Sequence, residues 1–185
     1  MVYIDEHIWD FDLDAALAEI SEQRREQALR FKHELGRRQC VLAYLLLKRG
    51  LREVFGIEDN PVFEFGEHGK PAIVGHADVF FNLSHCREAV ACVVDRVPIG
   101  IDVESVYRYD ERLARYTMND DEMAEILSSD NPGLTFTRLW TMKEALLKRK
   151  GRGLVDDLKH VLCGTDARFE TSVGGQESYV CTVSV

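Results

Sequence analysis

The sequence lacks any long hydrophobic run, and this absence excludes the simplest kind of membrane protein. No stretch among its 185 residues approaches the roughly 18 consecutive apolar residues of a spanning helix. The first residues, MVYIDEHIWDFDLD, are acidic, whereas a secretory signal is basic and then apolar. We therefore expect a folded, cytoplasmic protein that does not enter a membrane.

Paired metal-binding and disulfide motifs are missing as well. The five cysteines include no C-x-x-C pair, and their odd number does not suggest a disulfide framework. The six histidines show no H-E-x-x-H spacing. Most of the cysteines fall within apolar stretches, which predicts reduced core residues rather than zinc ligands. The remaining composition, 45% hydrophobic and 30% charged, is that of an ordinary globular protein.

Charge is unevenly distributed along the chain, whose formal net charge is −9. Residues 21–52 hold nine Lys and Arg against three Glu, and residues 138–152 hold six against Glu144 alone. Residues 102–130 hold nine Asp and Glu against three Arg. Such an acidic protein is not expected to coat nucleic acid, but its basic segments can hold a compact polyanion or a small acidic partner. The alternative is that these segments are solvated helix faces.

Hydrophobic periodicity predicts the helices and strands. Helical patterns cover residues 14–31, 37–55 and 119–127, with Asn119 as a cap, and Pro132 begins a further helix. Strand patterns form a hairpin around Gly66 and Gly69 and then recur at residues 79–83, 89–95, 99–104, 161–163, 167–171 and 177–185.

The order of these elements indicates the fold class. Helices followed by strands, and then a second group of helices and strands, are typical of α+β architecture. We expect two similar halves, residues 1–98 and residues 99–185, within one compact unit. The halves show no convincing internal sequence similarity, so their equivalence is a hypothesis.

The segment GIDVE places two carboxylates on one face of a predicted strand. Successive strand side chains point to opposite faces, so Asp102 and Glu104 share one face. Ile101 and Val103 take the other face, and by pattern alone this is an amphipathic strand. A third carboxylate nearby would favour a metal site over a simple amphipathic strand, because Mg²⁺ takes oxygen ligands and leaves coordination positions for water and phosphate.

The segment WTMKEALLK supplies the third carboxylate. Glu144 lies one turn after Trp140 and one turn before Lys148, so the three share a helix face. The simplest interpretation is an exposed ion pair, which contributes only about 0.3–0.5 kcal/mol. The apolar neighbours Phe136 and Leu139 argue against that interpretation, because burying an acid beside them is unfavourable unless a metal or a fixed cation neutralises its charge. A metal site with phosphate-facing lysines accounts for both features.

Two shorter segments, HGKPA and FNLSHC, contribute Lys70, Ser84 and His85. Neighbours on a strand point to opposite faces, so Ser84 and His85 cannot form a nucleophile and base pair. Each segment is a weak signal when taken alone. Their order along the chain, ahead of GIDVE and WTMKEALLK, is the stronger signal.

In this order and at these separations, GKPAI, FNLSHC, GIDVE and FTRLWTMKEALLK resemble the motifs of the 4′-phosphopantetheinyl transferases of the surfactin-synthetase-activating type. The resemblance spans residues 25–154, and the pairing of GIDVE with WTMKEALLK is its most specific part. It implies an α/β sandwich of two pseudo-equivalent halves around a coenzyme A cleft. It also implies transfer of the phosphopantetheine arm of coenzyme A to a serine of a carrier protein, with release of adenosine 3′,5′-bisphosphate.

The resemblance also implies roles for individual acids. Asp102, Glu104 and Glu144 resemble ligands of Mg²⁺, with Mn²⁺ as the other admissible ion, and the metal would bridge to the pyrophosphate of coenzyme A. Glu144 is thereby expected to act in catalysis as well. Glu122 resembles a glutamate that some members use as a general base.

Basic and polar residues are matched in the same way. Lys148 resembles the phosphate-binding, catalytic lysine of the WxxKEAxxK motif. Lys70, Ser84 and His85 resemble residues that hold the adenosine and its phosphates. Arg38 resembles the basic residue that meets the 3′-phosphate.

Two departures and several partners complete the expectations. Cys86 stands where many relatives have a small hydroxyl residue, and Gln27 stands where a lysine would help bind phosphate. The implied partners are coenzyme A as substrate and an apo acyl, aryl or peptidyl carrier protein of fatty-acid, polyketide or non-ribosomal peptide synthesis. We expect a monomer. The alternatives are a Mg²⁺-dependent hydrolase or phosphotransferase acting on coenzyme A or a nucleotide, and a non-catalytic binder of coenzyme A or carrier.

Overall fold

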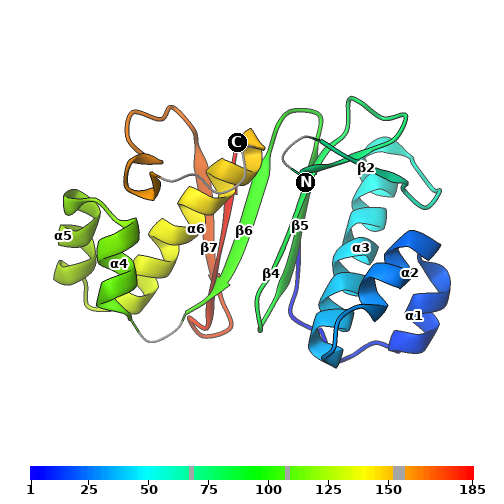
Figure 1. Ribbon diagram of the computed structural model, residues 1–185, viewed down its shortest axis with the longest axis horizontal. Helices are drawn as coiled ribbons and strands as arrows, with labels where there is room; N and C mark the ends of the chain where they lie inside the picture. The colour runs from blue at the N-terminus through cyan, green and yellow to red at the C-terminus, as the bar shows by residue number, and fades with distance from the viewer. Residues whose placement is uncertain (67–68, 107–108, 152–156) are drawn as a thin grey trace.

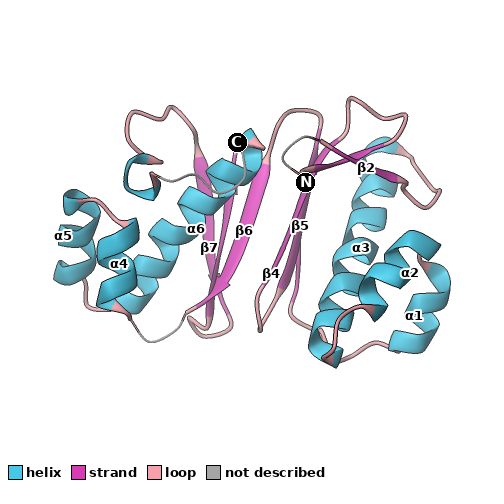
Figure 2. Ribbon diagram, viewed as in Figure 1, coloured by secondary structure: helices cyan, strands magenta, loops and turns pink. Residues whose placement is uncertain are grey.

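The computed structural model describes residues 1–66, 69–106, 109–151 and 157–185 of the chain. Two three-stranded antiparallel sheets pack against each other, and each carries its own group of helices on its outer side (Figure 1). Figure 2 shows the strands gathered in the middle of the molecule between the two helical layers. This mixture of helices and antiparallel sheets confirms the α+β class. No helix within the described ranges is long and apolar enough to cross a membrane.

The first group of elements forms the sheet β1-β5-β4, the hairpin β2-β3 and the helical layer α1–α3. Strand β5 is buried on both faces: Val90, Cys92 and Val94 pack under α3, while Ala91 and Val93 face the second sheet. A continuous apolar run is the pattern expected of such a strand. The elements are β1 (Val2–Asp5), α1 (Leu13–Glu19), α2 (Glu22–Leu29), α3 (Glu34–Phe55), β2 (Phe63–Phe65), β3 (Pro71–Ile73), β4 (Phe80–His85) and β5 (Val90–Asp95).

The single helix expected over residues 14–31 is wrong, because the chain forms two helices there. Ile20 has an extended backbone, and Ser21 begins α2 by accepting a hydrogen bond from Arg24 N at 3.2 Å. A serine at this position satisfies a free N–H group of the new helix. The break turns α2 so that Ala28 is buried with α3 residues. The hairpin and the strands at residues 79–83 and 89–95 are confirmed.

The second group forms the sheet β6-β8-β7 and the helical layer α4–α6. Asn119 and Glu122 make a capping box at the start of α5, which confirms the expected cap. The strand expected at residues 161–163 is wrong, since turns follow η1 there, and α4 was not anticipated. The elements are β6 (Gly100–Ser105), α4 (Glu111–Thr117), α5 (Asp120–Ser128), α6 (Pro132–Lys150), η1 (Leu158–His160), β7 (Phe169–Gly174) and β8 (Tyr179–Ser184).

The two sheets meet where β4 runs beside β6. Ile101 N donates to Asn82 Oδ1 at 3.2 Å, and Val103 N donates to Ser84 Oγ at 3.2 Å. Side chains of β4 therefore satisfy the outer N–H groups of β6, which would otherwise be an exposed edge. The expected boundary at residue 98 falls in the connection between β5 and β6, and the equivalence of the halves stays a prediction.

Helix α6 lies directly against the start of β6, and a glycine permits this approach. A Cβ added to Gly100 would stand 2.1 Å from Ala145 O and 2.5 Å from Arg149 N, a separation that real Cβ atoms do not show. The alternation of β6 is confirmed: Ile101 and Val103 pack toward the first sheet, and the C-terminal half of α6 covers the other face. Acids of β6 and α6 are thereby brought together.

Candidate active site

A closed cluster of three side chains lies at the junction of β4, β6 and α6. Lys148 Nζ donates to Asp102 Oδ1 at 2.6 Å and to Ser84 Oγ at 3.0 Å, and Ser84 Oγ donates to Asp102 Oδ1 at 3.0 Å. The Ser84 hydroxyl also accepts from Val103 N, so its one donor and two acceptor positions are all used. Three motifs that are distant in sequence, FNLSHC, GIDVE and WTMKEALLK, thus meet at one carboxylate.

The other two acids lie beside this cluster in a poorly solvated position. Burial, and then the charge of Asp102, raises the pKa of Glu104 to about 7. Burial and Asp102 raise the pKa of Glu144 in the same way, and Lys148 opposes the shift. Three carboxylates that face one lysine are an arrangement that favours a bound cation, because like charges in a low dielectric repel each other strongly.

The donor set suits a hard divalent cation in its chemistry, because all three side chains are carboxylates, although in the described residues the three do not converge on one point. Asp102 Oδ2 and Glu144 Oε1 are buried and have no hydrogen-bond partner among the residues described. Buried polar atoms are usually paired, so these two oxygens are available to a ligand; Tyr109 Oη, Glu122 Oε1 and Ser184 Oγ are unpaired in the same way, so it is the clustering of the acids that distinguishes this site. No three His, Cys, Asp or Glu side chains of the described chain are grouped closely enough here to share a metal ion. The ammonium of Lys148, at 2.6 Å from Asp102 Oδ1, occupies one side of the carboxylate instead.

Lys70 reaches the same helix from the hairpin of the first half. Its Nζ donates to Lys148 O at 2.7 Å and to Arg149 O at 3.1 Å, at the carbonyl end of α6. A cation is favourable there because the last carbonyls of a helix carry partial negative charge. Burial lowers the pKa of Lys70. The structure therefore ties Lys70 to α6 beside the cluster and does not direct its ammonium at Asp102.

His85 lies at the end of β4 near two cations. Loss of surrounding water lowers the pKa of His85, and the charges of Lys148 and Arg24 lower it further. Arg24 was not anticipated as a site residue, although it belongs to the basic segment 21–52. Its Nε and Nη2 donate to Cys40 O at 3.1 and 2.9 Å, and its Nη1 donates to Gln27 Oε1 at 2.9 Å. Gln27, where a lysine was expected, thus orients Arg24.

Arg38 is directed elsewhere. Its Nε donates to Glu34 Oε1 at 2.7 Å, and its Nη1 donates to Phe11 O at 2.9 Å. Its guanidinium also lies over the rings of Trp9 and Phe11, at 5.1 and 5.2 Å from their centroids. The structure does not bring Arg38 into the Ser84 cluster, and its contact with a 3′-phosphate stays a prediction.

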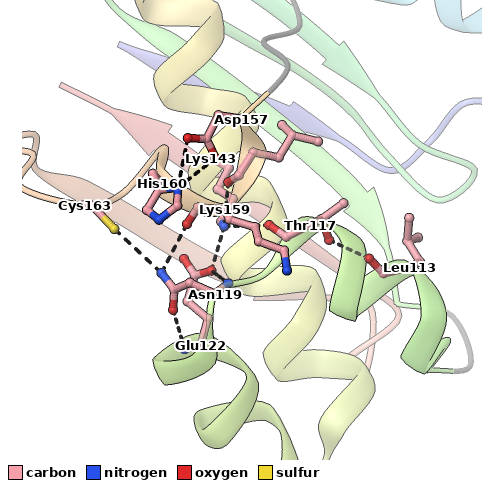
Figure 3. Close-up of polar contacts among 10 residues, drawn as sticks. Leu113, Thr117, Asn119, Glu122, Lys143, Asp157, Lys159, His160 and Cys163 are labelled. Atoms are coloured by element: carbon pink, nitrogen blue, oxygen red, sulfur yellow. Dashed lines mark hydrogen bonds and ion pairs between the residues drawn. The ribbon is translucent and has the colours of Figure 1, made fainter.

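Glu122 lies in a second polar network, at the junction of α4, α5 and α6 (Figure 3). Its Oε2 accepts from Asn119 N at 2.9 Å and from Lys143 Nζ at 2.7 Å. The fully buried Lys143 ammonium also donates to Thr117 O and to Leu158 O, both at 2.9 Å. With three acceptors around three N–H groups, Lys143 is completely satisfied. These contacts resemble those of a scaffold, and the role of Glu122 as a base stays a prediction.

Two cavities lie along the junction. One, of about 410 Å³, has an apolar floor that includes Phe80 and Phe81 and a basic rim formed by Lys70 and Arg149. The other, of about 320 Å³, borders Glu104 and Asp110 and has an apolar wall of Leu113, Phe136 and Trp140. The second gives the aromatic residues of α6 a role: Phe136 and Trp140 form part of the wall of a cavity beside Glu104 of β6.

The chain is similar to known proteins. The family model of the 4′-phosphopantetheinyl transferase superfamily matches residues 98–183. The 4′-phosphopantetheinyl transferase Sfp of Bacillus subtilis strain 168 is 30% identical over 156 residues, which cover 83% of this chain and 70% of the relative. The 4′-phosphopantetheinyl transferase gsp of Aneurinibacillus migulanus is 29% identical over 154 residues, or 82% of this chain and 62% of the relative.

A third relative matches over more of the chain. The 4′-phosphopantetheinyl transferase HetI of Nostoc sp. strain PCC 7120 is 28% identical over 185 aligned residues, which cover 90% of this chain and 78% of the relative. The chain therefore belongs to the 4′-phosphopantetheinyl transferase superfamily and, within it, to the Sfp type. The family and the α+β fold expected from the four motifs are both confirmed.

Proposed function

We propose that this chain uses Mg²⁺ to transfer the 4′-phosphopantetheine arm of coenzyme A to a serine of an acyl, aryl or peptidyl carrier protein. The observation that carries the proposal is the meeting of Ser84, Asp102 and Lys148, with unpaired buried oxygens on Asp102 and Glu144 beside them. A cation and a serine hydroxyl suit phosphate oxygens, and the free carboxylate oxygens suit a hard metal ion.

The surrounding cations support an elongated, phosphate-bearing substrate. Lys148 is the residue nearest to the acids, and its ammonium would hold the pyrophosphate. Arg24 and His85 form a second group of donors for the 3′-phosphate, with Lys70 on the rim of the larger cavity. The apolar floor of that cavity suits a base and ribose. The smaller cavity beside Glu104 suits the uncharged pantetheine arm, since its wall is largely apolar.

The reaction requires one bond to form and one to break. The carrier serine oxygen attacks the β-phosphorus of coenzyme A, the bond from that phosphorus to the bridging oxygen breaks, and adenosine 3′,5′-bisphosphate leaves with the electron pair. Mg²⁺, held by Asp102, Glu104 and Glu144, would supply Lewis-acid stabilisation of the charge on the pyrophosphate. Lys148 and Ser84 orient the phosphate oxygens, and such positioning is the larger part of catalysis in phosphoryl transfer.

The serine proton needs an acceptor within hydrogen-bond reach. Glu122, which the family resemblance suggests, is held by Lys143 and Asn119 at the junction of α4, α5 and α6. Glu104 borders the smaller cavity, and in the absence of metal its pKa is raised to about 7, so it is a candidate base in a site where Asp102 and Glu144 alone hold the metal. We propose Glu122 and Glu104 as competing candidates, which the variants described in the Discussion separate.

A single measurement tests the proposed activity against its alternatives. The protein is mixed with an apo carrier, coenzyme A and Mg²⁺, and the carrier is then weighed by mass spectrometry. A gain of one phosphopantetheine group supports the transferase. Free phosphopantetheine with an unchanged carrier indicates a hydrolase, and binding of coenzyme A without any product indicates a non-catalytic binder. The Asp102→Ala protein is the matched negative control.

Other properties belong to the same proposal. We infer that Mn²⁺ can replace Mg²⁺, because both accept oxygen ligands in octahedral geometry. A monomer in the cytoplasm, with no nucleic acid or membrane partner, is consistent with the net charge of −9 and the scattered basic segments. Sedimentation of the purified protein tests the monomer. Assays with carriers of fatty-acid, polyketide and peptide synthesis identify the pathway.

A further inference from the structure

The pairing of Lys148 with Asp102 has a consequence for the order in which ligands bind. Asp102 Oδ1 receives two hydrogen bonds, from Lys148 Nζ at 2.6 Å and from Ser84 Oγ at 3.0 Å. An ammonium at this distance neutralises the carboxylate and covers one of its oxygens. A metal ion that uses Oδ1 has to displace the ammonium or bind against its positive charge.

The two partners differ in their freedom to move. The Asp102 side chain is 3% exposed, whereas the Lys148 side chain is 30% exposed. Asp102 is fixed on β6 between the two halves, but the lysine can swing its ammonium toward the cleft. Ser84 and Asp102 engage two of its three N–H groups, which leaves the third for an acceptor outside the described residues. A phosphate oxygen can therefore begin to draw Lys148 away before the ion pair has broken.

We propose that Lys148 is a placeholder cation: its ammonium pairs with Asp102 until a phosphate of coenzyme A draws the ammonium away. Binding of the metal ion at Asp102 therefore depends on coenzyme A. This inference rests on the proposed function, because Asp102 is the proposed metal ligand. It goes further in assigning Lys148 two successive partners, Asp102 first and phosphate second. The unpaired oxygens Asp102 Oδ2 and Glu144 Oε1 are not blocked by the lysine, so they serve as the first contacts of the ion.

Thermodynamic linkage states what this arrangement requires. If the phosphate removes the competitor of the metal, coenzyme A tightens metal binding, and the metal tightens coenzyme A binding by the same factor. An uncharged side chain at position 148 cannot compete with the metal ion for Asp102. The Lys148→Met protein is therefore expected to bind metal more tightly than the wild type when no coenzyme A is present, although it has lost a phosphate-binding group.

The experiment measures binding of Mn²⁺ by electron paramagnetic resonance of the free ion, with no carrier and no turnover. Lys148→Met is expected to lower the dissociation constant for Mn²⁺ by roughly two- to fivefold, the scale of a partly exposed ion pair. Lys148→Arg keeps the charge and should bind as weakly as the wild type. Lys150→Met, at the exposed end of the same helix, is the control for an indirect charge effect. Circular dichroism establishes that each variant is folded.

The outcomes separate the inference from the function on which it rests. Tighter Mn²⁺ binding by Lys148→Met, with a smaller enhancement by coenzyme A than in the wild type, supports the placeholder. Equal or weaker binding by Lys148→Met, in a protein whose wild type binds Mn²⁺ with coenzyme A, overturns the placeholder alone. Absence of Mn²⁺ binding in all proteins, with or without coenzyme A, overturns both the placeholder and the proposed metal site.

Discussion

Helix α6 carries two lysines five positions apart, and each pairs with a buried carboxylate in a different way. Lys143 is fully buried, donates to three acceptors, and meets a Glu122 that also caps α5. Lys148 is 30% exposed, and the acids around it keep unpaired oxygens. Glu122 Oε1 is also buried without a partner among the described residues, so an unpaired oxygen does not by itself distinguish the two pairs. The comparison teaches that the exposure of the lysine, rather than residue type, separates a scaffold from a site: the fully buried Lys143 has all three N–H groups engaged, whereas the partly exposed Lys148 has one left for a ligand.

Removing the scaffold lysine should have the largest effect, and the effect should be on stability. Lys143→Met leaves the buried Glu122 carboxylate without its cation, with Asn119 N as its remaining donor, and removes the donor to two carbonyls, so we expect a loss of about 3–5 kcal/mol in the free energy of unfolding. Urea unfolding measures it. Lys148→Met should lose less, because the Lys148 side chain is 30% exposed and Ser84 Oγ still donates to Asp102 Oδ1 in the variant. Equal losses for the two variants would contradict the distinction drawn between them.

The role of Glu122, the partner of Lys143, can be tested with the same two measurements, stability and turnover. If Glu122 is a scaffold residue, Glu122→Gln weakens the hydrogen bond to Lys143 and lowers the free energy of unfolding, while turnover of the folded protein stays within a few-fold of the wild type. If Glu122 is the general base, the same substitution lowers turnover by about 10²–10⁴-fold, and this loss of turnover shrinks as pH rises from about 6 to 9. The pH profile of carrier labelling, measured beside the urea midpoint, decides between them. Glu104→Gln is the matched variant for the competing base.

Changes to the site acids should act on turnover and leave the fold intact. Asp102→Ala and Glu144→Ala each remove a proposed metal ligand, so we expect losses of on the order of a hundredfold or more. Carrier labelling at saturating Mg²⁺ is the measurement, and Glu125→Ala, an exposed acid of the neighbouring α5, is the control. Near-normal labelling by both site variants would remove the metal assignment.

Replacement of the basic residues should separate coenzyme A from dephospho-coenzyme A, which lacks the 3′-phosphate. His85→Ala and Arg24→Met are expected to weaken coenzyme A binding by about tenfold more than dephospho-coenzyme A binding, the scale of a charge-assisted hydrogen bond. Arg38→Met should weaken both equally or neither, because its donors face Glu34 and Phe11. Calorimetric titration of both ligands measures the difference. A selective loss in Arg38→Met alone would restore Arg38 as the 3′-phosphate ligand.

Much of the fold and part of the site could be predicted because their signals are local. The period-two pattern of GIDVE and the one-turn spacing of Trp140, Glu144 and Lys148 fix which side chains share a face. The break at Ser21 was missed because a serine is an ordinary residue within an amphipathic pattern until the next helix turns away. The identity of the cations near His85 depends on how α2 packs on α3, which no pattern along the chain encodes.

The roles of Lys143 and Lys148 could not be told apart for the same reason, because they depend on tertiary packing. Lys143 and Lys148 lie in one motif, WTMKEALLK, and the sequence shows both as cations on a helix. Only the packing of α4 and η1 over Lys143, with Thr117 O and Leu158 O as acceptors, makes it a core residue. Tertiary contacts therefore assigned the scaffold role to Lys143. Helical spacing placed Lys148 on the same face as Glu144, but its contact with Asp102 of β6 also depends on tertiary packing.

The smallest expected effect concerns the pH dependence of stability without metal. Burial beside Asp102 raises the pKa of Glu104 to about 7 from an ordinary value of 4.5, and Lys148 and Trp140 oppose the shift. The folded protein therefore keeps a proton that the unfolded chain has released. Stability contributed by this proton is present below the ordinary pKa and is lost as pH rises to about 7.

Glu104→Gln has no carboxyl group to titrate, so this loss should disappear in the variant. With chelator present, we expect the stability of the variant relative to the wild type to increase between pH 5 and pH 8 by on the order of 1 kcal/mol, a value reduced for partial exposure. Urea unfolding at four pH values measures the difference. Ser105→Ala, which changes a neighbour on the same strand without removing an acid of the site, is the control. Parallel curves for Glu104→Gln and the wild type would mean that Glu104 is ionised throughout, and Glu104 would then be the weaker candidate for the base.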